Sequence, residues 1–240
     1  MDTLDLKRAK KLKVKEINYL NLMVNNCTQV LPVLIKNIEL LLILIIVNIM
    51  DLKEYVLSKS TFIGGWYIPY KVCTELISFF KNHKTNHTPG MVSGPPRVDL
   101  NYKDSMEMSI DSKCNHPSVK SYLKYLREVI FKYQDRYETV KACEKFGLVE
   151  PFQIQYYKAG GGFKKWHFER TGKSINRCLV FMTYLNNVPA GGTHFKYQDL
   201  TTPAERGLTL IWPPDFTHTH KGQISSTREK YIMTGWLGYI

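Results

Sequence analysis

The sequence predicts an α+β fold in which two helices come first and an antiparallel barrel of strands follows. Residues 70–83 and 117–137 carry apolar side chains near helical spacing, and the second stretch shows the clearer pattern. Residues 177–185 and 207–212 are short and apolar, which is typical of buried strands. An antiparallel barrel built from such strands can bring together segments that are far apart in the sequence.

The composition is that of a globular chain with a sizeable core. Of the 240 residues, 44% are hydrophobic and 12% are aromatic, which suits one domain with appendages. The five cysteines show no Cys-x-x-Cys spacing, so free thiols in a reducing, cytoplasmic compartment are the simplest interpretation. The formal net charge of +12 is spread widely, and no nucleic-acid-binding motif accompanies it, so a nucleic-acid partner is not expected.

The N-terminal segment, residues 1–49, differs from the rest of the chain. Residues 7–15 are strongly basic, and residues 38–50 are almost wholly apolar. A membrane span needs roughly 20 apolar residues, so this run is short for one. It also begins late for a secretory signal, and no small-residue cleavage site follows it.

These features divide the chain into an atypical extension, residues 1–49, and one domain, residues 50–240. Two interpretations of the extension stay open. Either it associates weakly with a membrane, through residues 28–50, or it is a non-native extension ahead of a natural start at Met50.

The segments before the second helix have weaker patterns. Residues 51–59 are expected to form a short strand or the start of a helix, and the Gly-rich residues 64–69 are expected to form a turn. Residues 84–97, rich in Pro, Gly, Thr and Asn, predict a loop. Residues 99–105 predict an edge segment. Together with residues 160–166, the loop is a candidate lid over a site.

The strongest chemical signal lies in the last third of the chain. His167 and Glu169 are two residues apart, so a strand would place both side chains on one face. His220 follows 53 positions after His167, beyond a turn expected at Gly191-Gly192. Two imidazoles and a carboxylate on one ion leave coordination positions open, which is typical of a non-haem Fe(II) oxygenase. Lys230 then suggests an acidic cosubstrate.

From about Thr61 to its end, the chain resembles the prolyl 4-hydroxylase-type branch of the 2-oxoglutarate and Fe(II)-dependent dioxygenases. That family carries a His-x-Asp pair, a Gly-Gly stretch followed by Thr and Phe, a distal His, a basic residue soon after it, and two tyrosines near the cosubstrate. The matching residues here are His167 and Glu169, Gly191-Gly192-Thr193-His194-Phe195, His220, Lys230, Tyr157 and Tyr184, with Trp236 in the closing strand.

The resemblance implies a double-stranded β-helix (a jelly-roll or cupin-like barrel) with the N-terminal helices packed outside it. It also implies an oxidoreductase that uses Fe(II), 2-oxoglutarate and O₂ to hydroxylate a protein or small molecule, with ascorbate as a further candidate cofactor. His167, Glu169 and His220 would bind the iron. Lys230 would pair with the far carboxylate of 2-oxoglutarate, and Tyr157 and Tyr184 would donate hydroxyl hydrogen bonds to it.

One departure matters, because the family's carboxylate ligand is Asp and this chain has Glu169. The extra methylene moves the oxygens by about 1.5 Å. Glutamate suits a divalent ion and its reach can be absorbed by a rotamer change. The alternative is a catalytically inactive barrel that acts as a binding module. A zinc hydrolase is a weaker possibility, since Lys230 and the tyrosines would then have no purpose.

Other histidines and tyrosines have simpler interpretations. His218 would face the same way as His220 on a strand, so either could be the ligand; the ten-residue step to Lys230 favours His220. A strand tyrosine such as Tyr184 is more often a core aromatic than a cosubstrate contact. His194 is expected to be solvated. The remaining histidines in polar, turn-rich stretches are expected at the surface: His83, His87 and His116.

Overall fold

The computed structural model of the protein describes residues 15, 18, 36, 52–92 and 97–240. The expectations for residues 1–49 and for a start at Met50 therefore concern a part of the chain that lies, almost entirely, outside the described residues. By its contacts the chain divides into Met1–Asp51 and Leu52–Ile240. No helix within the described residues is long and apolar enough to cross a membrane.

The larger of the antiparallel sheets has eight strands. Its strand order is β1 (Gly64–Tyr67), β11 (Leu208–Trp212), β8 (Arg177–Tyr184), β13 (Lys230–Tyr239), β6 (Phe152–Tyr157), β4 (Met106–Ile110) and β2 (Thr88–Pro89), and β5 (Phe146–Gly147) also pairs with β13. The long strand β13 is central, since it pairs with β8 on one side and β6 on the other.

Two smaller antiparallel sheets complete the strand structure. One contains β10 (Leu200–Ala204), β9 (Val188–Phe195) and β12 (His220–Gly222), and the other contains β3 (Lys103–Asp104) and β7 (Gly162–Phe163). Short 3-10 helices connect the elements: η1 (Lys59–Thr61), η2 (Lys84–Asn86), η3 (Glu138–Ala142), η4 (Gly172–Ser174) and η5 (Phe216–His218). The described domain is thus rich in antiparallel sheet.

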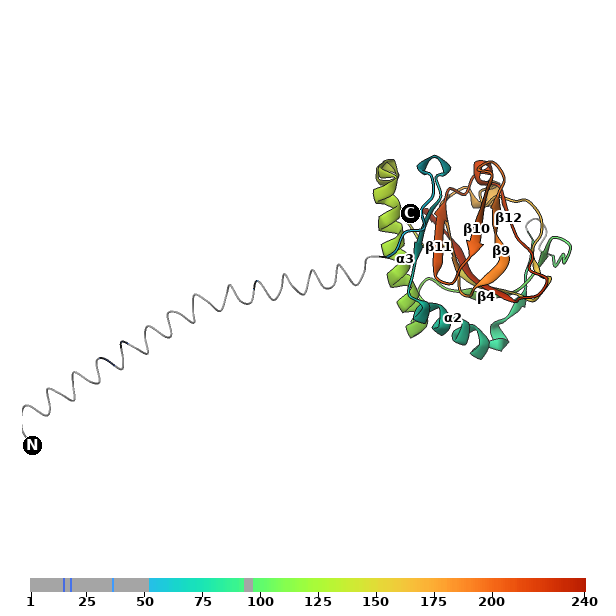
Figure 1. The fold of residues 1–240 in the computed structure, drawn as a ribbon, viewed down its shortest axis with the longest axis horizontal. Coiled ribbons are helices and arrows are strands. Elements are labelled where there is room, and N and C mark those ends of the chain that lie inside the picture. The colour runs from blue at the N-terminus through green and yellow to red at the C-terminus, as the bar shows by residue number, and fades with distance from the viewer. Residues whose placement is uncertain (1–14, 16–17, 19–35, 37–51, 93–96) are drawn as a thin grey trace, which may run out of the picture. The chain divides into compact units, whose positions relative to one another are not determined.

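Both predicted helices are confirmed and lie outside the strands (Figure 1). They are α2 (Tyr70–Asn82) and α3 (Pro117–Arg136). Pro117 opens α3, where its missing N–H costs nothing, and His116 caps it by accepting a hydrogen bond from the Ser118 N–H. The apolar faces of both helices are buried with one face of the large sheet.

The position of strand β8 between two cores explains why its sequence is almost continuously apolar. Leu179 and Phe181 belong to the core under the helices, whereas Val180, Met182 and Tyr184 belong to a second core with side chains of β9 and β11. Alternate residues of a strand point to opposite faces, so a strand with both faces covered needs apolar residues throughout.

The turns expected at residues 64–69 and at Gly191-Gly192 are wrong. Residues 64–67 form β1, and both Gly191 and Gly192 lie inside β9. Glycine is required there by close approach of neighbouring atoms rather than by a turn. A Cβ on Gly192 would lie 1.7 Å from the Thr202 carbonyl oxygen, and one on Gly64 would lie 2.7 Å from the Trp66 ring.

Other local expectations are partly met. Residues 159–160, just before the second candidate lid segment, form a turn in which Gly160 has a positive φ of 80°. Residues 84–97 are not wholly a loop, because they contain η2 and β2, and β2 pairs with β4. Of the stretch 51–59, the described residues 52–59 form neither a strand nor a helix apart from a bridge at Glu54 and the start of η1.

Candidate functional site

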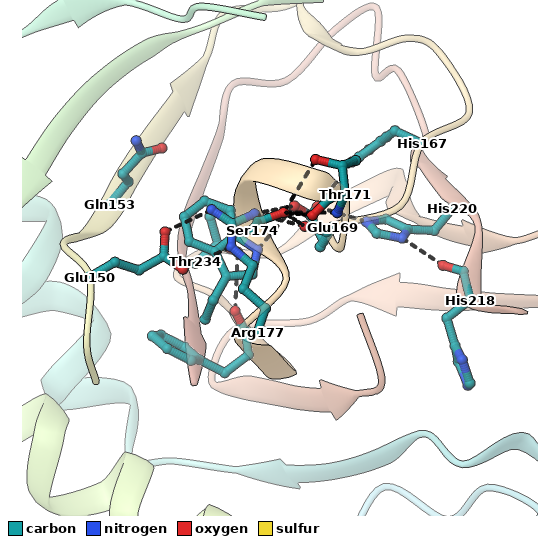
Figure 2. A network of polar contacts seen from close by, with 12 residues as sticks. Glu150, Gln153, His167, Glu169, Thr171, Ser174, Arg177, His218, His220 and Thr234 are labelled. Atoms are coloured by element: carbon teal, nitrogen blue, oxygen red, sulfur yellow. Dashed lines mark hydrogen bonds and ion pairs between the residues drawn. The ribbon is translucent and has the colours of Figure 1, made fainter. Parts of the chain in front are cut away.

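The structure brings together one ligand atom each from His167, Glu169 and His220 (Figure 2). These atoms lie within 4.8 Å of one another. Glu169 Oε1 is 3.4 Å from His167 Nε2 and 3.6 Å from His220 Nε2. The three residues that the sequence singles out therefore converge on one point. Two imidazole nitrogens and a carboxylate oxygen form a donor set that suits Fe(II).

The expected strand around His167 is replaced by a single backbone bridge. His167 pairs with His220 through an isolated antiparallel bridge, and Glu169 lies at a bend. The N–H groups of Glu169 and Arg170 both donate to the Pro214 carbonyl oxygen at 2.9 Å. The side chains of His167 and Glu169 still share one side, so the expectation was right about their convergence and wrong about a regular strand.

Backbone carbonyl groups orient both imidazoles. His167 Nδ1 is 3.0 Å from the Lys165 oxygen, and His220 Nδ1 is 2.9 Å from the His218 oxygen. A carbonyl oxygen can only accept, so each Nδ1 carries a proton, and the Nε2 atom near Glu169 is the one that a metal would use. The Phe163 ring also stacks on His167 with centroids 3.6 Å apart.

The surroundings of Glu169 and His220 fix the charge of both side chains near neutral pH. Burial raises the pKa of the Glu169 carboxyl, but the hydrogen bond and charge of His167, with His220 and Arg177, outweigh it and lower the pKa to about 2. Burial and the neighbouring His167 lower the pKa of His220 to about 3. Near pH 7 the site therefore offers an ionised carboxylate and a neutral His220 imidazole.

A second set of contacts involves the outer oxygen of Glu169, and the sequence analysis did not find it. Trp236 Nε1 donates to Glu169 Oε2 at 3.0 Å, and Arg177 Nη1 lies 3.5 Å from the same oxygen. The Arg177 guanidinium also donates two hydrogen bonds of 2.7 Å to Glu150. Trp236 could have been found from the sequence, because it matches the closing strand of the family that the chain resembles. No sequence pattern pointed to Arg177 or Glu150.

Lys230 opens β13 and is 6% exposed. Its Nζ donates to the carbonyl oxygens of Gly191, at 2.8 Å, and Gln223, at 3.1 Å. Burial lowers the pKa of this lysine to about 8. A buried ammonium held by carbonyl groups alone is well suited to bind an anion.

The two tyrosines predicted beside Lys230 are buried there. The Lys230 Nζ lies 5.3 Å from the centroid of the Tyr157 ring, whose hydroxyl donates to Gln155 Oε1. The Tyr184 hydroxyl is 2.6 Å from Thr193 Oγ1 and 3.1 Å from Thr202 Oγ1. Burial raises the pKa of Tyr184 to about 12, so it is neutral near pH 7 and can donate.

His218 does not share a face with His220, contrary to expectation. It ends the 3-10 helix η5, and strand β12 begins only at His220, so the period-two argument does not apply. Its Nε2 lies 2.9 Å from the Thr61 carbonyl oxygen. Figure 2 shows its ring pointing away from Glu169. His220 is therefore the distal member of the group.

The other histidines lie outside this group. His194 is half-buried, with Nδ1 2.7 Å from Thr201 Oγ1. His83, His87 and His116 are not free surface residues as expected, since each is half-buried against a phenylalanine ring.

A cavity of about 670 Å³ connects these features. His167, Glu169 and His220 line it, and so do Lys230 and both tyrosines. Both segments expected to form a lid contribute to its wall. They supply Thr88, Pro89, Met91 and Val92 from one segment and Phe163 and Trp166 from the other.

Comparison with known proteins agrees with this geometry. Residues 152–238 match the model of the 2OG-Fe(II) oxygenase superfamily. A curated relative, human prolyl 4-hydroxylase subunit alpha-3, is 30% identical over 105 residues, which cover 37% of this chain and 19% of the relative. The match thus spans less than a fifth of that relative.

Solved structures show the same fold. A prolyl-4-hydroxylase from Pseudomonas putida has a TM-score of 0.57 at 13% identity, over 75% of this chain and 93% of that one. A viral collagen prolyl hydroxylase from Paramecium Bursaria Chlorella virus-1, in complex with 2OG, has a TM-score of 0.56 at 16% identity, over 75% and 97%. A Trichoplax adhaerens prolyl hydroxylase with a hypoxia inducible factor peptide has a TM-score of 0.57 at 13% identity, over 75% and 84%.

The segment that matches the 2OG-Fe(II) oxygenase class, residues 152–238, thus contains the whole His167–Glu169–His220 group. Within that class, the resemblance to prolyl 4-hydroxylases that the sequence indicated is confirmed.

Proposed function

We propose that the domain of residues 50–240 is an Fe(II)- and 2-oxoglutarate-dependent dioxygenase, a hydroxylase of prolyl 4-hydroxylase type. One observation carries the proposal: the donor atoms of His167, Glu169 and His220 face the same cavity as the buried Lys230. In this proposal the large sheet and the β9–β10–β12 sheet are the two sides of a double-stranded β-helix.

His167, Glu169 and His220 would hold the Fe(II) ion. When bound, the iron supplies the redox chemistry by which O₂ and 2-oxoglutarate are converted, with the substrate, into CO₂, succinate and the hydroxylated product. The protein's part is to present two unprotonated Nε2 atoms and an ionised carboxylate on one side. The orienting bonds from Nδ1 to the Lys165 and His218 carbonyl oxygens keep those atoms in place.

Lys230 would bind the carboxylate of 2-oxoglutarate that lies away from the metal. Its ammonium, surrounded by carbonyl oxygens, gains an ionic partner, and Tyr184 and Tyr157 would donate hydroxyl hydrogen bonds to the same group. A 2-oxo acid without this second carboxylate would leave the ammonium unpaired. The buried lysine thereby selects the cosubstrate.

The charged side chains elsewhere on the cavity wall indicate what kind of substrate group can enter. Lys103 and Glu107 form an ion pair and are both 6% exposed. Arg177 is paired with Glu150 and Glu169. The remaining wall includes Gln153, Ser109 and Thr234 beside Trp166 and Trp236. An uncharged residue of a peptide, such as the prolyl residue suggested by the relatives, fits these surroundings better than a charged group.

Formation of succinate tests the proposal without a known substrate. Protein loaded with Fe(II) under anaerobic conditions is given 2-oxoglutarate and then O₂. Wild type is expected to form succinate, His167→Ala is expected to form none, and Lys230→Ala is expected to need much more 2-oxoglutarate. His194→Ala serves as the control, because His194 lies on β9 outside the group of three.

The outcomes separate the enzyme from an inactive binding module. Metal-dependent succinate formation supports the dioxygenase. Wild type that binds Fe(II) and 2-oxoglutarate but forms no succinate, even with a panel of prolyl peptides, favours the binding module. Wild type that does not bind Fe(II) overturns the metal site itself.

A further inference from the structure

We infer that Trp236 is a positioning residue for Glu169: its indole N–H holds one carboxylate oxygen so that the other faces the metal site. Arg177, stacked on the indole, keeps Trp236 in place. The inference rests on the proposed function, since it concerns the same metal site, and it gives the Glu169 carboxylate a structural partner.

The two oxygens of Glu169 have different partners. Oε1 faces the two histidines, 3.4 Å from His167 Nε2 and 3.6 Å from His220 Nε2. Oε2 faces away from them and accepts the Trp236 Nε1–H at 3.0 Å. A carboxylate that turned about its terminal bond would lose this hydrogen bond. The indole therefore favours one orientation, in which a single oxygen is presented to the metal.

Arg177 fixes the indole from the neighbouring strand. Its guanidinium carbon lies 3.6 Å from the centroid of the Trp236 ring. Arg177 and Trp236 lie on the paired strands β8 and β13. Two bonds of 2.7 Å to Glu150 and one of 2.9 Å to the Glu169 carbonyl oxygen hold the guanidinium. The Arg177 guanidinium that stacks on the indole is thus held in place by several hydrogen bonds.

The length of Glu169 is essential to this arrangement. An aspartate at this position would draw the carboxylate back by about 1.5 Å. The Trp236 hydrogen bond, now 3.0 Å, would then exceed hydrogen-bonding distance unless the backbone moved. That backbone is tied on both sides, because the Glu169 N–H donates to the Pro214 oxygen and its own carbonyl oxygen accepts from Ser174 and Arg177. The contribution of Trp236 should therefore depend on having glutamate at 169.

A double-mutant cycle on metal affinity tests the inference. The full-length protein is titrated calorimetrically with Mn(II), a redox-stable probe for the Fe(II) site, without cosubstrate. The proteins compared are wild type, Trp236→Phe, Glu169→Asp and the double variant. Phenylalanine keeps a ring under Arg177 but lacks the N–H. Trp66→Phe is the control for loss of an indole elsewhere, because Trp66 lies on β1 in the core under the helices and is not among the residues that line the cavity.

Trp236→Phe is expected to weaken Mn(II) binding about tenfold, as loss of an orienting partner of a metal ligand does. Trp66→Phe is expected to change the affinity less than about twofold. In the Glu169→Asp protein, adding Trp236→Phe should cost less than about threefold, because the aspartate cannot reach the indole. If Trp236→Phe fails to fold, Trp236 is replaced by benzothienylalanine, which keeps the bicyclic shape and lacks the N–H.

The possible results distinguish a failure of the positioning role from a failure of the metal site itself. Unchanged Mn(II) affinity in Trp236→Phe overturns the positioning role while leaving the metal site intact. The same loss in the glutamate and aspartate backgrounds also overturns it, since the effect of Trp236 would then not pass through Glu169. Wild type that binds no Mn(II) overturns the metal site, and the positioning role with it.

Discussion

His167 and His220, 53 residues apart, are joined to each other by their own backbones. The N–H of His167 donates to the carbonyl oxygen of His220 at 3.0 Å, and the N–H of His220 donates back to His167 at 2.9 Å. Their rings are consequently close, with centroids 4.3 Å apart. The same pair of hydrogen bonds that joins the two segments also sets the spacing of the two imidazoles, so the geometry of the proposed metal site depends on this backbone bridge.

Replacement of His220, and not of His218, should remove metal binding. His220→Gln takes away a nitrogen of the converging group, and we expect Mn(II) affinity to fall at least about tenfold. His218→Gln should keep the affinity within about threefold. It should instead lower the free energy of unfolding by about 1 kcal/mol, because the bond to the Thr61 carbonyl oxygen is lost. Calorimetric titration and urea unfolding measure the two effects. Loss of Mn(II) binding in His218→Gln alone would reverse the assignment.

The affinity for 2-oxoglutarate should fall as the pH rises above about 8. Burial lowers the pKa of Lys230 to about 8, so its ammonium is charged below this pH and becomes neutral above it. Only the charged form attracts the far carboxylate, and each further pH unit should raise the Kd up to about tenfold. The measurement is the Kd of 2-oxoglutarate with Mn(II)-loaded, anaerobic protein from pH 7 to 9.5.

Lys230→Arg provides the control for this pH dependence. A guanidinium stays charged throughout that range, so the Kd of this variant should change little with pH. A wild-type Kd that does not vary with pH, or an equal rise in Lys230→Arg, would show that another group causes the effect.

Gly192→Ala should destabilise the domain by about 2–3 kcal/mol, the range of an overpacked core. The new Cβ would lie 1.7 Å from the Thr202 carbonyl oxygen, so strands β9 and β10 would have to separate. Gly172→Ala is the matched control, because a Cβ there meets no atom within 4 Å. Urea unfolding of both variants, compared with wild type, gives the two free energies. Equal stability of the variants would refute the close approach at Gly192.

Tyr184→Phe should weaken both the fold and cosubstrate binding. Its hydroxyl lies between Thr193 and Thr202, and losing it leaves their buried hydroxyls with one partner fewer. We expect a loss of about 1–2 kcal/mol in unfolding free energy. We also expect a Kd for 2-oxoglutarate at least about threefold higher. Tyr197→Phe, at a tyrosine that is 62% exposed, is the control. A destabilised variant with unchanged Kd would assign Tyr184 to the core alone.

Local patterns predicted much of this domain. The helical spacing located α2 and α3 to within about a residue, as expected where one face of a helix packs on a sheet. The continuous apolar run identified β8 as a buried strand. The spacing of His167, Glu169, His220 and Lys230 matched a known arrangement, and the structure places all four on one cavity. Their roles as ligands and cosubstrate contacts remain predictions.

The sequence patterns gave wrong predictions where one residue type can serve more than one structural purpose. Gly64 and Gly191-Gly192 were interpreted as turns because glycine often supplies unusual backbone angles, yet here it leaves room for Trp66, Val188 and the Thr202 backbone inside a sheet. His218 was placed on the face of His220 because a strand was assumed to run through both. The 3-10 helix η5 ends at His218 and β12 begins at His220, so the alternation fails.

The sequence by itself determined the chemistry available to the protein: two histidines, one carboxylate and one lysine in a familiar order, on segments with recognisable helix and strand patterns. Only the tertiary structure decided how the carboxylate is used. The contacts of Glu169 with Trp236 and Arg177, and of Arg177 with Glu150, join segments whose separation in the chain carries no periodic signal. Periodicity reports which face of an element is buried, whereas such contacts depend on which strands become neighbours in the folded sheet.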